Sequence, residues 1–173
     1  MTESYETAFP THERPRVFVA DDDPSQREFL KTLLAPRGYD ISAFDRGEDL
    51  LDAVFKNPPD LILLDVMLPE KNGYEICKAV RENRAALGYI PVLLVSVLSD
   101  SLDRTFGSEA GADDFISIPF VPEELVSRIK SLLRTKKQYD QMAQSKKLLE
   151  EKNRRLLEMI DRLMEANGSS GRR

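Results

Sequence analysis

The feature that most constrains the fold is a run of four apolar residues, Leu61–Leu64, that ends at Asp65. The run lies between Pro58-Pro59 and the turn-forming residues that follow Pro69. A short segment without polar side chains on either face is typical of a strand buried on both sides of a parallel sheet. Asp65 would then stand at the carboxyl end of a strand, where open α/β sheets hold their chemistry. The alternative is a carboxylate that only caps the next turn.

Further short apolar segments alternate with segments of helical period. The expected strands cover residues 16–20, 39–44, 61–65, 89–96 and 114–118. Each is followed by apolar residues at three- and four-residue spacing, which predicts a helix after every strand. This alternation predicts an α/β fold, in which a parallel sheet is covered by helices on both faces and joined by right-handed crossovers.

Carboxylates follow two of these strands. Asp21 and Asp22 come directly after the first strand, and Asp65 ends the third. Because the carboxyl ends of parallel strands share one edge, we expect these side chains to meet, and a cluster of carboxylates usually holds a cation. Oxygen ligands with room for water suit Mg²⁺. Ser96 ends the fourth strand, so this edge could accept a phosphoryl group on Asp65 with Ser96 as a hydrogen-bond donor.

Composition excludes several other chemistries. His12 is the only histidine, which argues against histidine-based catalysis and against a histidine phosphodonor within the chain. Cys77 is the only cysteine, so no internal disulfide can form, and its place in a helical pattern predicts a packed thiol. No apolar run approaches the ~20 residues of a membrane span. The polar first 15 residues do not resemble a signal peptide, so we expect a cytoplasmic location and no membrane.

The charge changes along the chain. Residues 1–133 carry 14 basic and 24 acidic side chains, whereas residues 134–165 carry 9 and 6. An acidic body is a poor binder of nucleic acid. We therefore expect four segments: a flexible leader at 1–15, an α/β domain at 16–134, a helix at 135–167 and a disordered tail at 168–173.

The strand-end motifs together resemble the receiver domain of two-component response regulators, over residues 16–134. The resemblance rests on residues 17–24 (VFVADDDP), 63–75 (LLDVMLP and NGYE), 91–96 (PVLLVS), 111–115 (GADDF) and 119–120 (PF). It implies a flavodoxin-like, doubly wound, five-stranded parallel sheet with strand order 2-1-3-4-5.

The resemblance also implies roles for individual residues. Asp65 would accept a phosphoryl group from the phosphohistidine of a histidine kinase or phosphotransfer protein. Asp22, Asp65 and the backbone carbonyl of Met67 would ligate Mg²⁺, and Asp21 would act largely through water. Such a domain is no enzyme beyond its own phosphorylation from a donor and its autodephosphorylation.

In this family, two residues change conformation on phosphorylation, and two others set the rate of autodephosphorylation. Ser96 would move toward the phosphoryl group, and Phe115 would be the aromatic rotamer switch. Met67 and Leu98 stand where the family tunes autodephosphorylation. Both are apolar here and cannot position a water molecule, so we expect slow hydrolysis.

The sequence departs from the family at Ile118, where the family places a lysine before the Pro-Phe pair. That lysine neutralises phosphoryl charge, whereas an isoleucine can only pack. A basic side chain from a neighbouring loop, Lys71 or Arg104, is the alternative source of charge. The resemblance also makes the Ile118–Pro119 bond a candidate cis peptide, although X-Pro bonds in general are cis in only ~5% of cases.

Three functional interpretations therefore stay open. The first is a phosphorylated receiver with atypical switching. The second is a degenerate receiver that acts as a phosphorylation-independent dimerisation scaffold. The third is a Mg²⁺-dependent phosphatase, which is disfavoured because Met67 stands where a second aspartate would follow Asp65 and because no cap domain is evident.

The last helix is expected to begin near Pro122, and neither proline nor glycine follows until Gly168. Its apolar residues fit a heptad pattern that predicts a coiled-coil homodimer. Position a holds Tyr139, Lys146, Asn153 and Ile160, and position d holds Met142, Leu149, Leu156 and Leu163. A helix of about 45 residues, roughly 65 Å long, would not stay helical unpacked.

Other residues of this helix bear on the orientation and the size of the assembly. The lysine and asparagine at position a favour a parallel, in-register pair. Leu157, Met159 and Met164 widen the apolar stripe, which suits a higher-order bundle or a continuation into another module. The basic residues are interspersed with the seam rather than gathered beyond one end, so a DNA-binding basic zipper is disfavoured.

Overall fold

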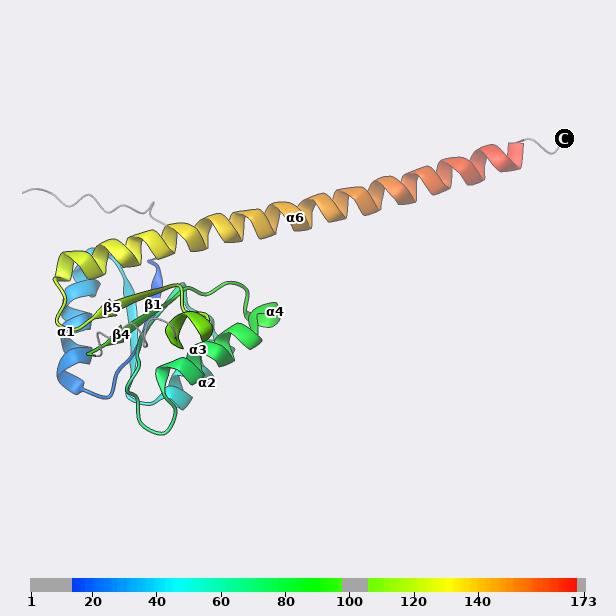
Figure 1. Cartoon of the computed structure of the whole chain (residues 1–173). Coiled ribbons are helices and arrows are strands. Elements are labelled where there is room, and N and C mark those ends of the chain that lie inside the picture. The colour runs from blue at the N-terminus through cyan, green and yellow to red at the C-terminus, as the bar shows by residue number, and fades with distance from the viewer. Residues whose placement is uncertain (1–13, 98–105, 171–173) are drawn as a thin grey trace, which may run out of the picture. The chain divides into compact units, whose positions relative to one another are not determined.

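A computed structural model describes residues 14–97 and 106–170 of the chain. Strands and helices alternate along it (Figure 1). The strands are β1 (Arg16–Ala20), β2 (Asp40–Phe44), β3 (Leu61–Asp65), β4 (Val92–Ser96) and β5 (Asp114–Ser117). The helices are α1 (Pro24–Leu34), α2 (Gly47–Lys56), α3 (Gly73–Glu82), α4 (Arg84–Leu87) and α6 (Pro122–Ser170), with a 3₁₀ turn at Ala35–Arg37.

The five strands form one parallel sheet in the order β2-β1-β3-β4-β5. The apolar run that opened the sequence argument is its central strand, and Leu61, Ile62, Leu63 and Leu64 are all buried. Burying a side chain of this size contributes about 1.5–3 kcal/mol relative to leaving it exposed. The predicted doubly wound sheet with strand order 2-1-3-4-5 is confirmed.

Each face of the sheet has its own apolar core, because successive strand residues point to opposite faces. The first core joins Val17, Val19, Leu61 and Leu63 to apolar residues of α1 and of the first turns of α6. The second joins Phe18, Ala20, Ile62 and Leu64 to residues of α2 and α3. Figure 1 shows these helices on the two sides of the sheet.

Side-chain caps begin two of the helices that follow the carboxyl ends of the strands. Asp23 caps α1 by accepting a hydrogen bond from the backbone N–H of Ser25, and Pro24 occupies the first turn. Asn72 caps α3 in a reciprocal capping box with Glu75.

Some local features differ from the expectation. The 3₁₀ turn and the short helix α4 were not predicted, because each is only about one turn long and carries no periodic apolar signal. A helix was expected between the fourth and fifth strands; residues 106–109 are helical, and residues 98–105 lie outside the described residues. The expected leader also lies outside them, except for residues 14 and 15.

Helix α6 is continuous over 49 residues, and the chain divides into compact units at residues 1–136 and 137–173. The prediction that the last helix continues well past the sheet is confirmed. The helix ends at Ser170, so it includes the first three residues of the segment that we expected as a tail. Gly168 disfavours a helix by only about 1 kcal/mol relative to alanine, which does not by itself end it.

Candidate functional site

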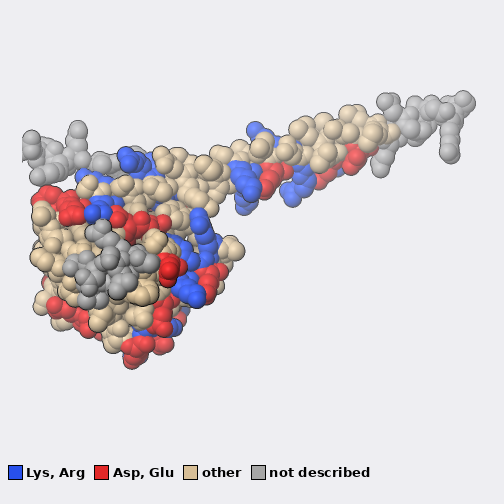
Figure 2. Space-filling model, viewed as in Figure 1, with Lys and Arg blue, Asp and Glu red and all other residues tan. Residues whose placement is uncertain are grey.

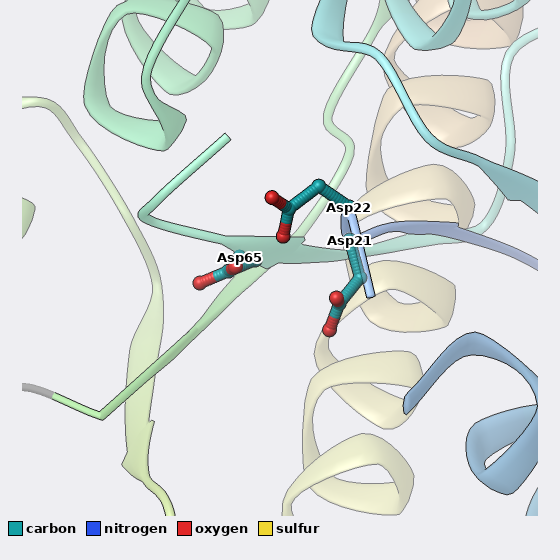
Figure 3. Close-up of side chains that lie close together, drawn as sticks. All are labelled: Asp21, Asp22 and Asp65. Carbon is teal, nitrogen blue, oxygen red and sulfur yellow. The ribbon is translucent and has the colours of Figure 1, made fainter. Parts of the chain in front are cut away.

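The ends of two neighbouring strands bring three carboxylates together. β1 and β3 run in parallel with Ala20 beside Leu64, so the residues that follow lie at one edge of the sheet. Carboxylate oxygens of Asp21, Asp22 and Asp65 lie within 4.8 Å of one another. Figure 3 shows the three side chains gathered at the ends of these strands. The structure thus assembles the cluster expected from the sequence.

Local hydrogen bonds hold the loop after β1 in place. The Asp21 carboxylate accepts from the backbone N–H of Asp23 at 2.8 Å, and its backbone N–H donates to the carbonyl of Phe44 at 3.2 Å. The guanidinium of Arg27 donates to the Asp21 carbonyl at 2.7 Å. Asp21 is therefore fixed from the neighbouring strand β2 and from α1. Its side chain is buried, whereas that of Asp22 is exposed.

The loop after β3 is held by a close approach of two backbones. The N–H of Gly73, the first residue of α3, donates to the Val66 carbonyl at 3.0 Å. A Cβ atom at Gly73 would lie 2.5 Å from the carbonyl oxygen of Asp65 and 2.9 Å from the Cα of Val66. Only glycine fits here without moving the end of the strand at Asp65. The Asp65 carboxylate accepts from the Met67 N–H at 3.1 Å.

The cluster carries an excess of negative charge. Burial, together with the charges of Asp65 and Asp22, raises the pKa of Asp21 to about 6 despite the N–H bond from Asp23. Burial and the charge of Asp22 also raise the pKa of Asp65, while N–H bonds from Met67 and Val66 lower it. Within the described residues, no basic side chain is among the groups that shift the pKa of Asp65.

These residues fit a bound Mg²⁺ ion. Mg²⁺ takes oxygen ligands at 2.0–2.1 Å in an octahedron, which places ligand atoms roughly 3–4 Å apart. Three carboxylate oxygens within 4.8 Å need only a small inward movement to reach that spacing. A divalent cation would also offset the charge that raises the pKa values of Asp21 and Asp65. The Met67 carbonyl follows directly in the loop, and its role as a ligand stays a prediction.

Ser96 lies at the same edge of the sheet. Asp65 pairs with Val95 across β3 and β4, and Ser96 is the next residue, paired with Ser117 of β5. Its side chain is fully buried. Its backbone carbonyl accepts a hydrogen bond from the N–H of Ile118 at 2.7 Å. Ser96 therefore lies close to the strand that ends at Asp65, and its movement toward a phosphoryl group stays a prediction.

Ile118 is partly buried and packs against the apolar core between the sheet, α1 and the first turns of α6. The Ile118–Pro119 peptide bond is cis, which confirms the bond geometry that the family resemblance implied. Lys71, one alternative source of charge, lies in the loop between β3 and α3, and its N–H donates to the carbonyl of Pro69. The other, Arg104, lies outside the described residues, as does Leu98.

Phe115, the other predicted switch residue, sits in β5 beside Leu94 of β4. Its ring is partly buried against the core that includes α3. A cavity of about 270 Å³ adjoins it, lined also by Gly107, Asp114 and Arg128. The residue therefore has open space next to it, as a side chain that changes rotamer requires.

The sequence argument missed an ion pair next to this edge. Arg46, which precedes α2, pairs with Glu70 in the loop after β3. Glu70 has a φ of 66°, an uncommon conformation for a residue other than glycine, asparagine or aspartate. The pair ties two loops of the site edge together. Its members are 24 residues apart, and no local pattern in the sequence marks them as partners.

A second network, centred on Arg81 of α3, was also missed. Its guanidinium pairs with Asp113 and donates to the carbonyls of Gly111 and Ile90 at 2.6 and 2.7 Å. Asp113 also accepts from the Tyr89 hydroxyl at 2.8 Å. These contacts fix α3 to the segments before β4 and β5, and are therefore structural.

The predicted seam residues of α6 are exposed in the single chain. Exposed fractions are 42% for Tyr139, 72% for Met142, 59% for Leu149, 56% for Leu156, 50% for Ile160 and 62% for Leu163. Lys146 and Asn153 are also exposed. Contiguous exposed apolar side chains of this kind are typical of an interaction surface, and the partner helix stays a prediction.

Comparison with known proteins agrees with this geometry. The family described as response regulator receiver domain matches residues 17–130. The chain belongs to this family. It is 40% identical over 121 residues to the DNA-binding response regulator MtrA of Mycolicibacterium smegmatis, a match that covers 70% of this chain and 51% of MtrA. It is 39% identical to the transcriptional regulatory protein GltR of Pseudomonas aeruginosa, covering 68% of this chain and 48% of GltR.

A solved structure shows the same fold. The receiver domain of the Francisella response regulator 1452 is 30% identical and superimposes with a TM-score of 0.65, covering 70% of this chain and 98% of that one. The receiver chain spans about half the length of MtrA and GltR. Within the described residues, no helix combines the length and the apolar character needed to cross a bilayer.

Proposed function

We propose that this receiver domain accepts a phosphoryl group on Asp65 from the phosphohistidine of a histidine kinase or phosphotransfer protein, with Mg²⁺ as cofactor. The observation that carries the proposal is the cluster of Asp21, Asp22 and Asp65 within 4.8 Å, at the strand edge of a chain that belongs to the receiver family. We expect no catalysis beyond this self-phosphorylation and the hydrolysis that reverses it.

The chemistry is a transfer between two side chains. A carboxylate oxygen of Asp65 attacks phosphorus, the bond between phosphorus and the donor imidazole nitrogen breaks, and the imidazole leaves with the electron pair. The N–H bonds from Met67 and Val66 lower the pKa of the attacking carboxylate and so partly oppose the increase that burial causes. Mg²⁺ held by the three aspartates would neutralise charge on the phosphoryl oxygens. Met67 has an exposed apolar side chain that cannot orient water, so hydrolysis is slow.

Ile118 makes this receiver atypical. Its side chain contributes packing to the core and no charge to the phosphoryl site. Removing one preorganised donor from the charged oxygens of a transition state typically slows a reaction by about 10²–10³-fold. We therefore expect slow phosphorylation and a switch that depends on Ser96 and Phe115 rather than on a lysine.

The signal would leave through a homodimer formed by α6. The exposed positions of the predicted seam recur every three and four residues from Tyr139 to Leu163 and need a partner helix to be buried. A second copy of the same helix supplies a matching surface in a parallel, in-register pair. Phosphorylation at Asp65 would bias β5 and α6, and through α6 the geometry of the pair.

The second candidate is a phosphorylation-independent dimerisation scaffold. The observation that favours it is Ile118, which occupies the position of a charged family residue with a side chain packed into the core. In this case the aspartate cluster would bind a cation without reporting phosphorylation. The two candidates share the dimeric helix and differ in what happens at Asp65.

One experiment separates them. We would incubate the protein with Mg²⁺ and acetyl phosphate and record its intact mass, beside Asp65→Asn and Ile118→Lys. A phosphoryl adduct on the wild type that Asp65→Asn abolishes supports the receiver function. An adduct on Ile118→Lys alone supports the scaffold. No adduct on either chain, under conditions that label an ordinary receiver, rules out Asp65 as an acceptor.

DNA binding is not part of the proposal. MtrA is named as DNA-binding and GltR as a transcriptional regulator, but the match covers only about half of each protein. The basic residues of α6 are interspersed with its apolar seam, and residues 1–133 are acidic overall. Titration with double-stranded DNA at low salt should show no saturable binding by this chain.

A further inference from the structure

The apolar face of α6 is not equally wide along its length. Between residues 139 and 153 the apolar side chains keep mainly to the a and d positions, and Lys146 interrupts position a. Between residues 156 and 164 apolar side chains fill more of the helix, with exposed fractions of 50–62%. They are Leu156, Leu157, Met159, Ile160, Leu163 and Met164.

The additional residues stand beside the seam. With Leu156 and Leu163 at position d, Leu157 and Met164 fall at position e and Met159 at position g. In a two-stranded coiled coil these flanking positions stay partly in water and usually carry charges that select the partner. A helix that is apolar at e and g as well as a and d has the wider face of a helix inside a bundle.

We propose that residues 156–164 of two parallel pairs join tail to tail in an antiparallel four-helix bundle, which makes the assembly a tetramer. The inference rests on the proposed dimer of α6. A second pair of the same helices supplies the matching occupant, because each pair leaves Leu157, Met159 and Met164 uncovered in both of its chains. The apolar face is continuous with the seam that forms the pair.

Lys146 and Asn153 confine the bundle to this segment. In a four-stranded parallel bundle along the whole helix, four Lys146 ammonium groups would share one core layer, and their mutual repulsion opposes it. Overlap of the C-terminal parts leaves the Lys146 layer within each two-stranded pair. Its side chain is exposed and lies 3.9 Å from Glu150 of the same helix, so it can extend to solvent.

The charges on the segment are compatible with an antiparallel overlap. The wide apolar face carries Glu158, Asp161 and Arg162, and Arg155 comes just before it. In antiparallel helices whose overlap is centred on residue 160, Glu158 of one pair lies opposite Arg162 of the other, and Arg155 lies opposite Glu165. Figure 2 shows uncharged surface along this part of α6 with charged side chains gathered to one side.

The test measures the mass of the full chain by size-exclusion chromatography with light scattering. A flank variant carries Leu157→Gln, Met159→Gln and Met164→Gln, and a seam variant carries Leu156→Gln and Leu163→Gln; glutamine keeps the helix propensity high. We expect four chains for the wild type, about a twofold loss of mass for the flank variant and a single chain for the seam variant. Far-UV circular dichroism reports whether the receiver sheet stays folded.

A distance measurement tests the orientation. Spin labels are placed on Ser145→Cys, because the native Cys77 is buried and stays unlabelled. We expect one short distance within each pair and a second distance near 45 Å between pairs. The second follows from a rise of about 1.5 Å per residue on both sides of an overlap centred on residue 160. Short distances alone in a tetramer would overturn the tail-to-tail arrangement.

The outcomes separate this inference from the proposed dimer. A wild-type mass of two chains overturns the bundle and leaves the dimer standing. A wild-type mass of one chain overturns both. A flank variant that keeps four chains overturns the assignment of the interface to residues 156–164.

Discussion

Neutralising the most buried carboxylate of the site should stabilise the metal-free protein. Asp21→Asn keeps the shape of the side chain, and its amide oxygen can still accept the hydrogen bond from the Asp23 N–H. It removes the negative charge that burial and three neighbouring carboxylates oppose. The expected gain therefore comes from relief of electrostatic cost and not from a new contact.

The pKa shift of Asp21 gives the size of the expected gain in the free energy of unfolding. Folding raises this pKa from 3.8 to about 6, which is roughly two pKa units at about 1.4 kcal/mol each. At neutral pH an ionised Asp21 thus lowers the free energy of unfolding by up to about 3 kcal/mol. Salt screens the part that comes from exposed Asp22, so we expect the variant to gain about 1–3 kcal/mol.

The sign of the pH dependence follows from the same shift. Because the folded pKa lies above the unfolded one, the contribution of Asp21 to stability is fully present below about pH 4 and is lost as the pH rises through about 6. The difference between variant and wild type should therefore be small at pH 4 and largest above pH 6. At a hundredfold excess over Kd, Mg²⁺ should raise the free energy of unfolding of the wild type by about 2.7 kcal/mol. The Asp21→Asn variant should gain less, because it lacks one of the three carboxylates.

Urea denaturation in EDTA and in Mg²⁺ measures these differences. Tyrosine fluorescence reports the receiver, since Tyr39 and Tyr89 are buried, and a fixed protein concentration keeps the contribution of association constant. Asp52→Asn, on the exposed side of α2, is the matched control and should change stability by less than about 0.5 kcal/mol. An Asp21→Asn protein no more stable than wild type in EDTA at pH 7.5 would refute this reasoning.

Two further predictions concern contacts that stabilise the receiver domain. Arg81→Gln should lower the free energy of unfolding by about 2–4 kcal/mol, because it removes the half-buried ion pair with Asp113 and the donors to two carbonyls. Arg46→Gln should lower it by less than about 1 kcal/mol, since the pair with Glu70 is exposed. Urea titration tests both, and equal losses would contradict the role of burial. Burial raises the pKa of Cys77 to about 11, so a thiol reagent at pH 8 should label it only in urea; rapid native labelling would contradict a packed thiol.

The sheet and the carboxylate cluster could be predicted from the sequence for physical reasons. The buried strands show as uninterrupted apolar runs such as Leu61–Leu64, and parallel strands must present their carboxyl ends at one edge. The pairs Arg46–Glu70 and Arg81–Asp113 join residues 24 and 32 positions apart. No local periodicity encodes such contacts, because they form only after the loops have been placed by the fold.

Ile118 links the site to α6 by packing instead of charge. Its N–H donates to the Ser96 carbonyl, and its side chain packs in the core that contains Leu125 and Ile129 from the first turns of α6. A lysine at this position would carry its ammonium toward the carboxylates, but it would remove an apolar side chain from that core. In the proposed mechanism, phosphorylation would move β5 through Ser96 and through the open space beside Phe115, and the packing of Ile118 would pass that movement to the first turns of α6.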